Sequence, residues 1–322
     1  MTTLAPTGTQ RGPNLRRPGD ALAEASIGAV PILWNNVDLA DLRPTVEVDT
    51  VLDEIVRTGY EGTQEGRGFP RGEPLRAMLA ARGLRLAEVY ASIPCTEDGP
   101  APGALEIARD RLAVLHEGGG EVLVAALDGS PERAVWSGRA GEGLVPRLSD
   151  DGWRRLASLV DRLAAEAIDL GHALAWHQHT GTFVETPAEA DRLFAETDPA
   201  RVGICLDVGH WTVGGGDPVD ALRRYGPRVT HVHLKDVDPD VLAGLRDGRT
   251  SGWDDAIRAR LFTELGGGLL DLPAILGELH ARGFAGWLMV EQDSCWGPPS
   301  ESAAIGRRVL AAELRRLGNA GS

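Results

Sequence analysis

Four apolar segments of this chain each end in a histidine or a carboxylate. They lie at residues 173–177, 202–207, 229–234 and 287–291, and the polar groups at their ends include His177, Asp207, His233 and Glu291. A carboxylate in the middle of a buried strand is costly, but at the C-terminal end of a strand it can point into an open mouth. Barrels of parallel strands collect their functional groups at this end. Four such ends in one chain therefore predict a barrel that gathers a metal site at its mouth.

Patterns typical of strands and of helices alternate along most of the 322 residues. The expected strands are residues 27–33, 59–63, 84–90, 121–127, 173–177, 202–207, 229–234 and 287–290. The expected helices are residues 48–58, 74–82, 103–117, 149–170, 186–197, 218–225, 272–282 and 302–317. Eight strand-then-helix units without a break in composition predict a single-domain α/β fold, a (β/α)8 TIM barrel over residues 26–318. A doubly wound open sheet is the alternative, although no G-x-G-x-x-G follows the first strand, which counts against a dinucleotide-binding version.

Two segments fall outside this alternation. Residues 1–25 are rich in Thr, Gly, Pro and Arg without periodicity, which predicts a disordered or loosely packed, flexible tail. Residues 236–271 form a long insertion after the seventh strand, with a helical stretch near residues 253–262. Loops of this length in barrels are usually functional, so we expect either a lid or a subunit contact there.

Composition narrows the range of partners. The formal net charge of -14 argues against a nucleic acid or an anionic membrane surface, because both select basic proteins. No apolar segment is long enough to span a bilayer, and the N-terminus lacks the apolar stretch of a secretory signal. The three widely spaced cysteines suit a reducing compartment, and Cys205 is expected to fill space in the core. These features predict a cytoplasmic protein, and they are compatible with a homo-oligomer.

Several motifs at the strand ends resemble those of the inosose dehydratases, within the xylose-isomerase-like sugar isomerases and epimerases. The sharpest are His-Gln-His-Thr-Gly-Thr at 177–182, Asp-Val-Gly-His at 207–210, His-Val-His-Leu-Lys-Asp at 231–236 and Gly-Trp-Leu-Met-Val-Glu-Gln-Asp at 286–293. The resemblance runs from about residue 34 to residue 293. It implies a TIM barrel, a divalent metal such as Mn²⁺ or Co²⁺, and a small polyhydroxylated keto substrate, either a keto-cyclitol or a keto-sugar. One departure stands out: the dehydratases usually read Gly-Thr-Glu after the second strand, whereas this chain has Gln64, with Glu65 one position later.

The resemblance also implies a ligand set. In the wider group the fifth strand usually ends in Glu-x-His and its Glu binds metal; here His177 stands in that position. We therefore expect His177, Asp207, His233 and Glu291 to bind the metal. Two carboxylates and two imidazoles suit Mn²⁺ or Co²⁺, and Zn²⁺, Fe²⁺ or Mg²⁺ are compatible alternatives. We expect His231 to be a core histidine that points to the opposite side of its strand from His233.

Other polar residues at the strand exits are candidates for catalysis and substrate binding. His210 and Glu65 are candidates for proton transfer, with Lys235 and His179 as donors to substrate oxygens. The alternative for Lys235 is a salt bridge with Asp236, and that for Glu65 is a surface acid. The candidates for substrate binding are Trp34, Asn35, His179, Trp211 and Asp293. Trp34 is equally compatible with sealing the top of the barrel.

Such a site favours chemistry through an enolate, since a cation stabilises negative charge on a carbonyl oxygen and makes the neighbouring carbon more acidic. The leading hypothesis is a metal-dependent hydro-lyase of inositol metabolism that dehydrates a keto-inositol or a related keto-sugar. An epimerase or isomerase of a free keto-sugar, or a 3-keto-glycoside lyase, would use the same metal site. A non-catalytic barrel subunit is the alternative from a different class.

Overall fold

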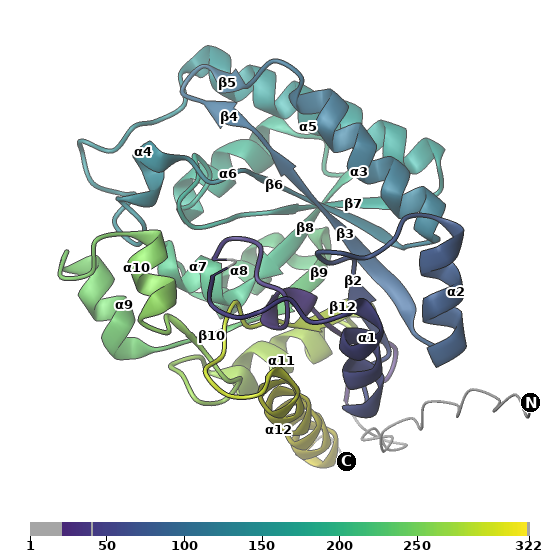
Figure 1. The fold of residues 1–322 in the computed structure, drawn as a ribbon. Helices are drawn as coiled ribbons and strands as arrows, with labels where there is room; N and C mark the ends of the chain where they lie inside the picture. The colour runs from purple at the N-terminus through teal and green to yellow at the C-terminus, as the bar shows by residue number, and fades with distance from the viewer. Residues whose placement is uncertain (1–20, 40, 321–322) are drawn as a thin grey trace, which may run out of the picture.

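The computed structural model describes residues 21–39 and 41–320. Within them, eight parallel strands close into a barrel in the order β1-β12-β9-β8-β7-β6-β3-β2. Their bounds are β1 Ser26–Ala29, β2 Gly62–Gln64, β3 Arg85–Ile93, β6 Val122–Leu127, β7 Ala173–His177, β8 Val202–Asp207, β9 Val229–Leu234 and β12 Trp287–Val290. Figure 1 shows these strands at the centre of the molecule with the longer helices around them. The predicted TIM barrel is confirmed.

The helices follow the strands as the apolar periodicity predicts. The larger ones are α1 Val48–Arg57, α2 Glu73–Arg82, α3 Ala104–Gly118, α5 Asp150–Asp169, α6 Pro187–Glu196, α8 Pro218–Tyr225, α11 Leu272–Ala281 and α12 Pro299–Ala320. Caps explain where several of them begin. The hydroxyl of Thr186 accepts from the Glu189 N–H while the Glu189 carboxylate accepts from the Thr186 N–H, a capping box that fixes the start of α6.

Smaller elements depart from the predicted boundaries. The first strand ends at Ala29, because Pro31 cannot donate to a strand ladder and instead begins the 3-10 helix η1 Pro31–Leu33. The hairpin β4 Cys95–Thr96 and β5 Gly99–Pro100 follows β3, and the short helix α4 Pro131–Ala134 follows β6. Of the predicted tail, only residues 21–25 lie within the described part of the chain. Among them Ala21, Leu22 and Ala25 are buried, and the Ala21 N–H donates to the Leu314 carbonyl of α12.

The predicted insertion at residues 236–271 has its own small core. It contains β10 Asp236–Val237, α9 Pro239–Arg246, α10 Trp253–Arg258 and β11 Phe262–Thr263. Its apolar side chains, among them Leu245, Ile257 and Phe262, form a cluster that is separate from the main core. Figure 1 shows α9 and α10 beside the barrel, next to α7 Val208–Val213. No helix among the described residues is both long enough and apolar enough to cross a membrane.

Two irregularities in the barrel ladder bear on the site. The register between β2 and β3 pairs Thr63 with Leu86 but Gln64 with Glu88, so one residue of β3 is skipped. The register between β8 and β9 pairs Ile204 with Val229 but Cys205 with His231, so Thr230 is skipped. Bulges of this kind change the direction of side chains and are frequent beside active sites.

Candidate metal centre at the barrel mouth

Neighbouring strand ends bring the four predicted ligands together. His177 and Asp207 are the last residues of β7 and β8, and Glu291 directly follows β12. Asp207 pairs with His233 of β9 in the strand register. All four side chains are buried or nearly so, with relative exposures of 0–9%. Their common depth at the C-terminal end of the strands follows from the parallel register of the barrel.

The distances among these groups are short enough for one cation. His177 Nε2 lies 3.6 Å from Asp207 Oδ2, and His233 Nδ1 lies 3.7 Å from the same oxygen. His233 Nδ1 lies 2.7 Å from Glu291 Oε2. Asp207, His233 and Glu291 each offer one ligand atom, and these three atoms lie within 4.8 Å of one another.

Hydrogen bonding supports the same interpretation. Asp207 Oδ2, which lies near both His177 Nε2 and His233 Nδ1, has no hydrogen-bond partner among the described residues. Asp207 Oδ1, in contrast, accepts from the His210 N–H at 2.8 Å, which leaves Oδ2 to face the other ligands. Buried polar atoms are rarely left without a partner unless something else binds them. The donor set, two imidazoles and two carboxylates, suits a divalent transition metal.

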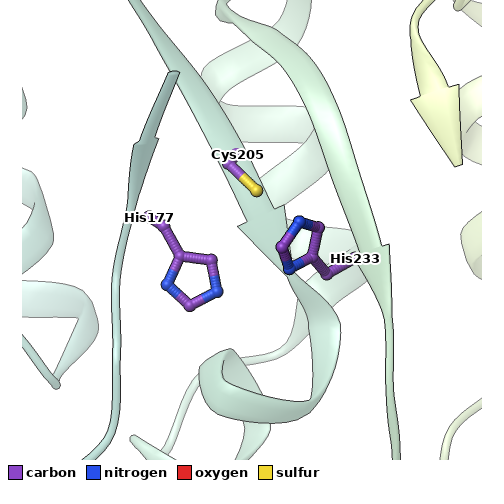
Figure 2. Close-up of side chains that lie close together, drawn as sticks. All are labelled: His177, Cys205 and His233. Atoms are coloured by element: carbon purple, nitrogen blue, oxygen red, sulfur yellow. The ribbon is translucent and has the colours of Figure 1, made fainter. Parts of the chain in front are cut away.

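Cys205 also lies close to two of these residues, His177 and His233. Figure 2 shows the side chains of His177, Cys205 and His233 pointing toward one another from three adjacent strands. The three residues offer ligand atoms within 4.8 Å of one another. Burial raises the pKa of the Cys205 thiol to about 12, so the side chain is uncharged in this structure. Cys205 therefore fits the predicted role of filling space in the barrel interior.

Lys235 balances the negative charge of the site. Its Nζ lies 2.6 Å from Glu291 Oε1, 2.7 Å from Asp293 Oδ1 and 3.7 Å from Asp207 Oδ2. Burial opposes the charged form, but these three carboxylates hold the pKa of Lys235 well above its usual value. The lysine is thus an ammonium ion inside the protein. The alternative of a salt bridge with Asp236 is wrong, because the Asp236 carboxylate instead accepts from backbone N–H groups of Gly266, Gly268 and Leu270.

His210 and His179 have different access to substrate. His210 is fully buried, with Nδ1 2.9 Å from Thr180 Oγ1 and Nε2 3.0 Å from Lys235 Nζ, and its ring stacks on Trp253 of α10. Burial, with His179 and Lys235 nearby, holds the pKa of His210 well below its usual value. His179 lines the cavity, and its Nδ1 lies 2.7 Å from the Thr180 carbonyl oxygen, which can only accept. Nδ1 therefore carries the proton, and Nε2 of the neutral ring is a hydrogen-bond acceptor rather than the predicted donor.

A cavity of about 600 Å³ opens beside the four predicted ligands. Among the predicted site residues, its lining includes Asn35, Glu65, His177, His179, His233, Glu291 and Asp293. Asp293 is held by Lys235; burial and Glu291 raise its pKa to about 8, although Lys235 acts in the opposite direction. The side chain of Asn35 stabilises the loop before α1, because it donates to the Val46 carbonyl and accepts from the Val46 N–H. The side chain of Glu65 forms an ion pair with Arg111 at the cavity wall.

Two residues expected to bind substrate have other surroundings. Trp34 does not line the cavity; it is buried, and its indole Nε1 donates to Glu54 of α1 at 2.6 Å. Trp211 also lies outside the cavity lining, edge-on to Tyr225 of α8. The aromatic wall of the cavity is supplied instead by Trp253 of the insertion, which sequence periodicity alone could not place there.

Two buried residues near the ligands were assigned wrongly or missed. His231 does not point away from His233: residues two apart on a strand share a face, and both imidazoles contact Glu88. Glu88 itself, fully buried in β3, was not among the predicted site residues. A signal was present in the sequence, because a carboxylate in the apolar run Leu86 to Val89 must have a buried partner.

Gly209 allows the strand end of β9 to pack against α7. A Cβ at this position would lie 2.6 Å from the Lys235 carbonyl oxygen and 3.1 Å from the Lys235 Cβ. We expect Gly209→Ala to lower the free energy of unfolding by about 1–3 kcal/mol through overpacking. Denaturant unfolding measures this change. The matched control is Gly277→Ala in α11, where a Cβ meets nothing within 4 Å; that variant should be at least as stable as the parent. Equal stability of both variants would contradict the steric argument.

Comparison with known proteins identifies the family to which the chain belongs. The family model for the xylose isomerase-like TIM barrel matches residues 52–313. An inosose dehydratase of Geobacillus kaustophilus is 36% identical over 88% of this chain and 93% of its own length. The rhizopine catabolism protein MocC of Rhizobium meliloti is 36% identical over 91% of this chain and 89% of its own. A structure of L-ribulose 3-epimerase has the same fold, with a TM-score of 0.70 and 18% identity over 92% of this chain and 97% of that chain.

The predicted resemblance is therefore confirmed over nearly the whole fold. The motifs at residues 177–182, 207–210, 231–236 and 286–293 lie in the matched span, and all of them lie at the C-terminal ends of barrel strands. The chain belongs to the xylose isomerase-like TIM barrel family, and within it to the relatives of the inosose dehydratases.

Proposed function

We propose that this protein is a metal-dependent lyase that dehydrates a keto-inositol of the inosose type or a closely related keto-sugar. The observation that carries the proposal is the convergence of His177, Asp207, His233 and Glu291, all buried or nearly so, with Asp207 Oδ2 3.6 Å from His177 Nε2 and 3.7 Å from His233 Nδ1 beside an open cavity. A sugar-modifying enzyme is supported by the curated relatives and by the structural neighbours together. Dehydration is favoured over epimerisation because relatives named inosose dehydratase match along almost their full length.

The charge of the cavity suits a small polyhydroxylated ketone. Its lining mixes acids such as Asp38, Asp128 and Asp254 with the guanidinium groups of Arg67 and Arg111. Arg111 is already paired with Glu65. A phosphorylated substrate needs unpaired basic groups, whereas hydroxyls bind well to a mixture of donors and acceptors.

The residues present fit a bound cation of the Mn²⁺ or Co²⁺ class, held by His177, Asp207, His233 and Glu291. When bound, such a cation supplies stabilisation for the negative charge that develops on a carbonyl oxygen. Glu65 lies at the cavity wall and is our candidate base for the proton on the carbon beside the carbonyl. The proton that Glu65 takes from that carbon must then reach the β hydroxyl, which leaves as water, so that Glu65 ends as the carboxylate that it was at the start. Asp293 and His179 Nε2 line the same space and orient the substrate hydroxyls.

The enclosed residues act indirectly. Lys235 does not line the cavity and contacts Glu291 and Asp293, so it positions these two carboxylates. His210 contacts Lys235 on one side and Thr180 on the other. We propose that both hold the charged groups of the mouth in place rather than exchanging protons with substrate directly.

The proposal can be tested with scyllo-inosose as substrate. Protein loaded with Mn²⁺ is expected to produce an enone, followed by its ultraviolet absorbance, and chelator-treated protein is expected to produce none. Absence of an enone, together with uptake of solvent deuterium beside the carbonyl of a free ketose, would replace dehydration by epimerisation. Failure of the native protein to bind Mn²⁺, Co²⁺ or Zn²⁺ would remove the metal site altogether.

A further inference from the structure

Glu88 is a carboxylate inside the barrel, below the proposed metal ligands. It is fully buried, and its Oε2 lies 3.0 Å from His233 Nε2 and also contacts His231 Nε2. Its other oxygen, Oε1, accepts from Gln64 Nε2 at 2.7 Å. One carboxylate thus contacts two imidazoles and one amide, and both of its oxygens have partners.

Both irregularities of the barrel ladder flank this group. The shift between β2 and β3 places Glu88 directly opposite Gln64, and the shift between β8 and β9 places His231 opposite Cys205. A regular pairing would put Ala87 beside Gln64 instead. One shift thus lies beside Glu88 and the other beside its partner His231, and irregularities of this kind change the direction of side chains near active sites.

The contacts fix the orientation of His233. Glu88 accepts hydrogen bonds, so the proton of the His233 ring that it binds sits on Nε2. Nδ1 of the same ring lies 2.7 Å from Glu291 Oε2 and 3.7 Å from Asp207 Oδ2, so it is the nitrogen that faces the other proposed ligands. As a ligand to a cation it would carry a lone pair in place of a proton. Histidines that bind metals usually donate their other N–H to a carboxylate, which fixes the tautomer and makes the ligand nitrogen more basic.

We propose that Glu88 is a positioning residue that holds His233 with Nδ1 toward the cation, and that this role requires one carboxylate in the Gln64–Glu88 pair. Gln64 and Glu88 are hydrogen-bonded partners, so the charge can lie on either member of the pair. The inference rests on the metal site of the proposed function.

A role in packing alone does not explain the arrangement. Buried ion pairs are weak evidence for a role in stability, because replacing a whole buried pair by apolar side chains is often neutral or stabilising. Glu88 instead has its charge directed at the imidazole that is proposed to bind metal, while the neighbouring Ala87 and Val89 are apolar.

The test compares the Mn²⁺ affinity of three variants by calorimetry, with circular dichroism as a check on folding. Glu88→Gln keeps the shape and removes the charge, and we expect it to weaken Mn²⁺ binding by about 10–100-fold. The double variant Glu88→Gln with Gln64→Glu returns one carboxylate to the pair and should recover most of the lost affinity. Glu54→Gln is the matched control, since this carboxylate accepts from Trp34 outside the cavity; its affinity should equal that of the native protein.

A second measurement does not depend on affinity. Nitrogen-15 NMR of the Zn²⁺-loaded native protein should show the proton of His233 on Nε2, with Nδ1 unprotonated. The opposite tautomer, or Mn²⁺ affinity in Glu88→Gln within about twofold of native, would overturn the positioning role. A double variant no tighter than Glu88→Gln would overturn the exchange between positions 64 and 88. Both failures differ from failure of the proposed function, in which the native protein itself would bind no metal.

Discussion

Replacing Asp207 by Asn is expected to abolish metal binding and to lower turnover of a keto-inositol by about 10³-fold or more, the equivalent of several kcal/mol of transition-state stabilisation. The substitution keeps the shape of the side chain. It also preserves an oxygen that can accept from the His210 N–H, the hydrogen bond that begins α7. What it removes is the charge on the oxygen that lies 3.6 Å from His177 Nε2 and 3.7 Å from His233 Nδ1.

The decisive measurements are metal content after dialysis and the initial rate of enone formation. Asp217→Asn is the matched control, because Asp217 likewise caps a helix, α8, but is exposed and does not line the cavity. The control should retain both metal and activity. Full metal content and activity in Asp207→Asn would show that this carboxylate is not a ligand.

Replacing Lys235 by Met is expected to destabilise the metal-free protein by about 3–5 kcal/mol, because carboxylates are left buried without a compensating charge. Lys235 is 1% exposed, and its Nζ lies within 2.7 Å of both Glu291 and Asp293. Burial opposes ionisation of Glu291, but Lys235 and His233 hold its pKa well below the usual value. Without the lysine, ionised Glu291 loses its nearest cation.

Bound metal should restore part of the stability lost in Lys235→Met, since a divalent cation also neutralises the carboxylates. Thermal unfolding with and without Mn²⁺ therefore provides the test: the rise in Tm on adding Mn²⁺ is expected to be larger for Lys235→Met than for the native protein. Lys235→Arg keeps the charge, and its rise in Tm on adding Mn²⁺ should lie between those of Lys235→Met and the native protein. If the variant folds only when metal is present during expression, chelation should unfold it. Unchanged metal-free stability in Lys235→Met would contradict the charge balance described above.

The parts of the site that were predicted correctly depend on strand ends. The sequence places His177, Asp207 and Glu291 directly at the ends of apolar runs, and parallel strands in a barrel must end at the same rim. Their approach to within a few ångströms could therefore be expected before any coordinates. The family resemblance selected His233 as the fourth member.

Other contacts joined residues far apart in the sequence, and no local pattern could supply them. Trp253 reaches His210 only because the insertion folds back over the mouth. Glu88 meets His233 across 145 residues of sequence, through two shifts in register that are invisible in an apolar pattern. The indole of Trp34 lies against Glu54 rather than in the cavity, because its N–H donates a hydrogen bond to this carboxylate on the first helix.

The amino-acid sequence by itself determined the barrel, the family and the rim at which charged groups collect, because hydrophobic periodicity and strand termini are local properties of the chain. The tertiary structure alone decided which nitrogen of each histidine faces the ligands, which carboxylates surround Lys235 and which aromatic ring closes the cavity. Those outcomes depend on ladder register and on side-chain burial, and both are set only when distant segments pack together.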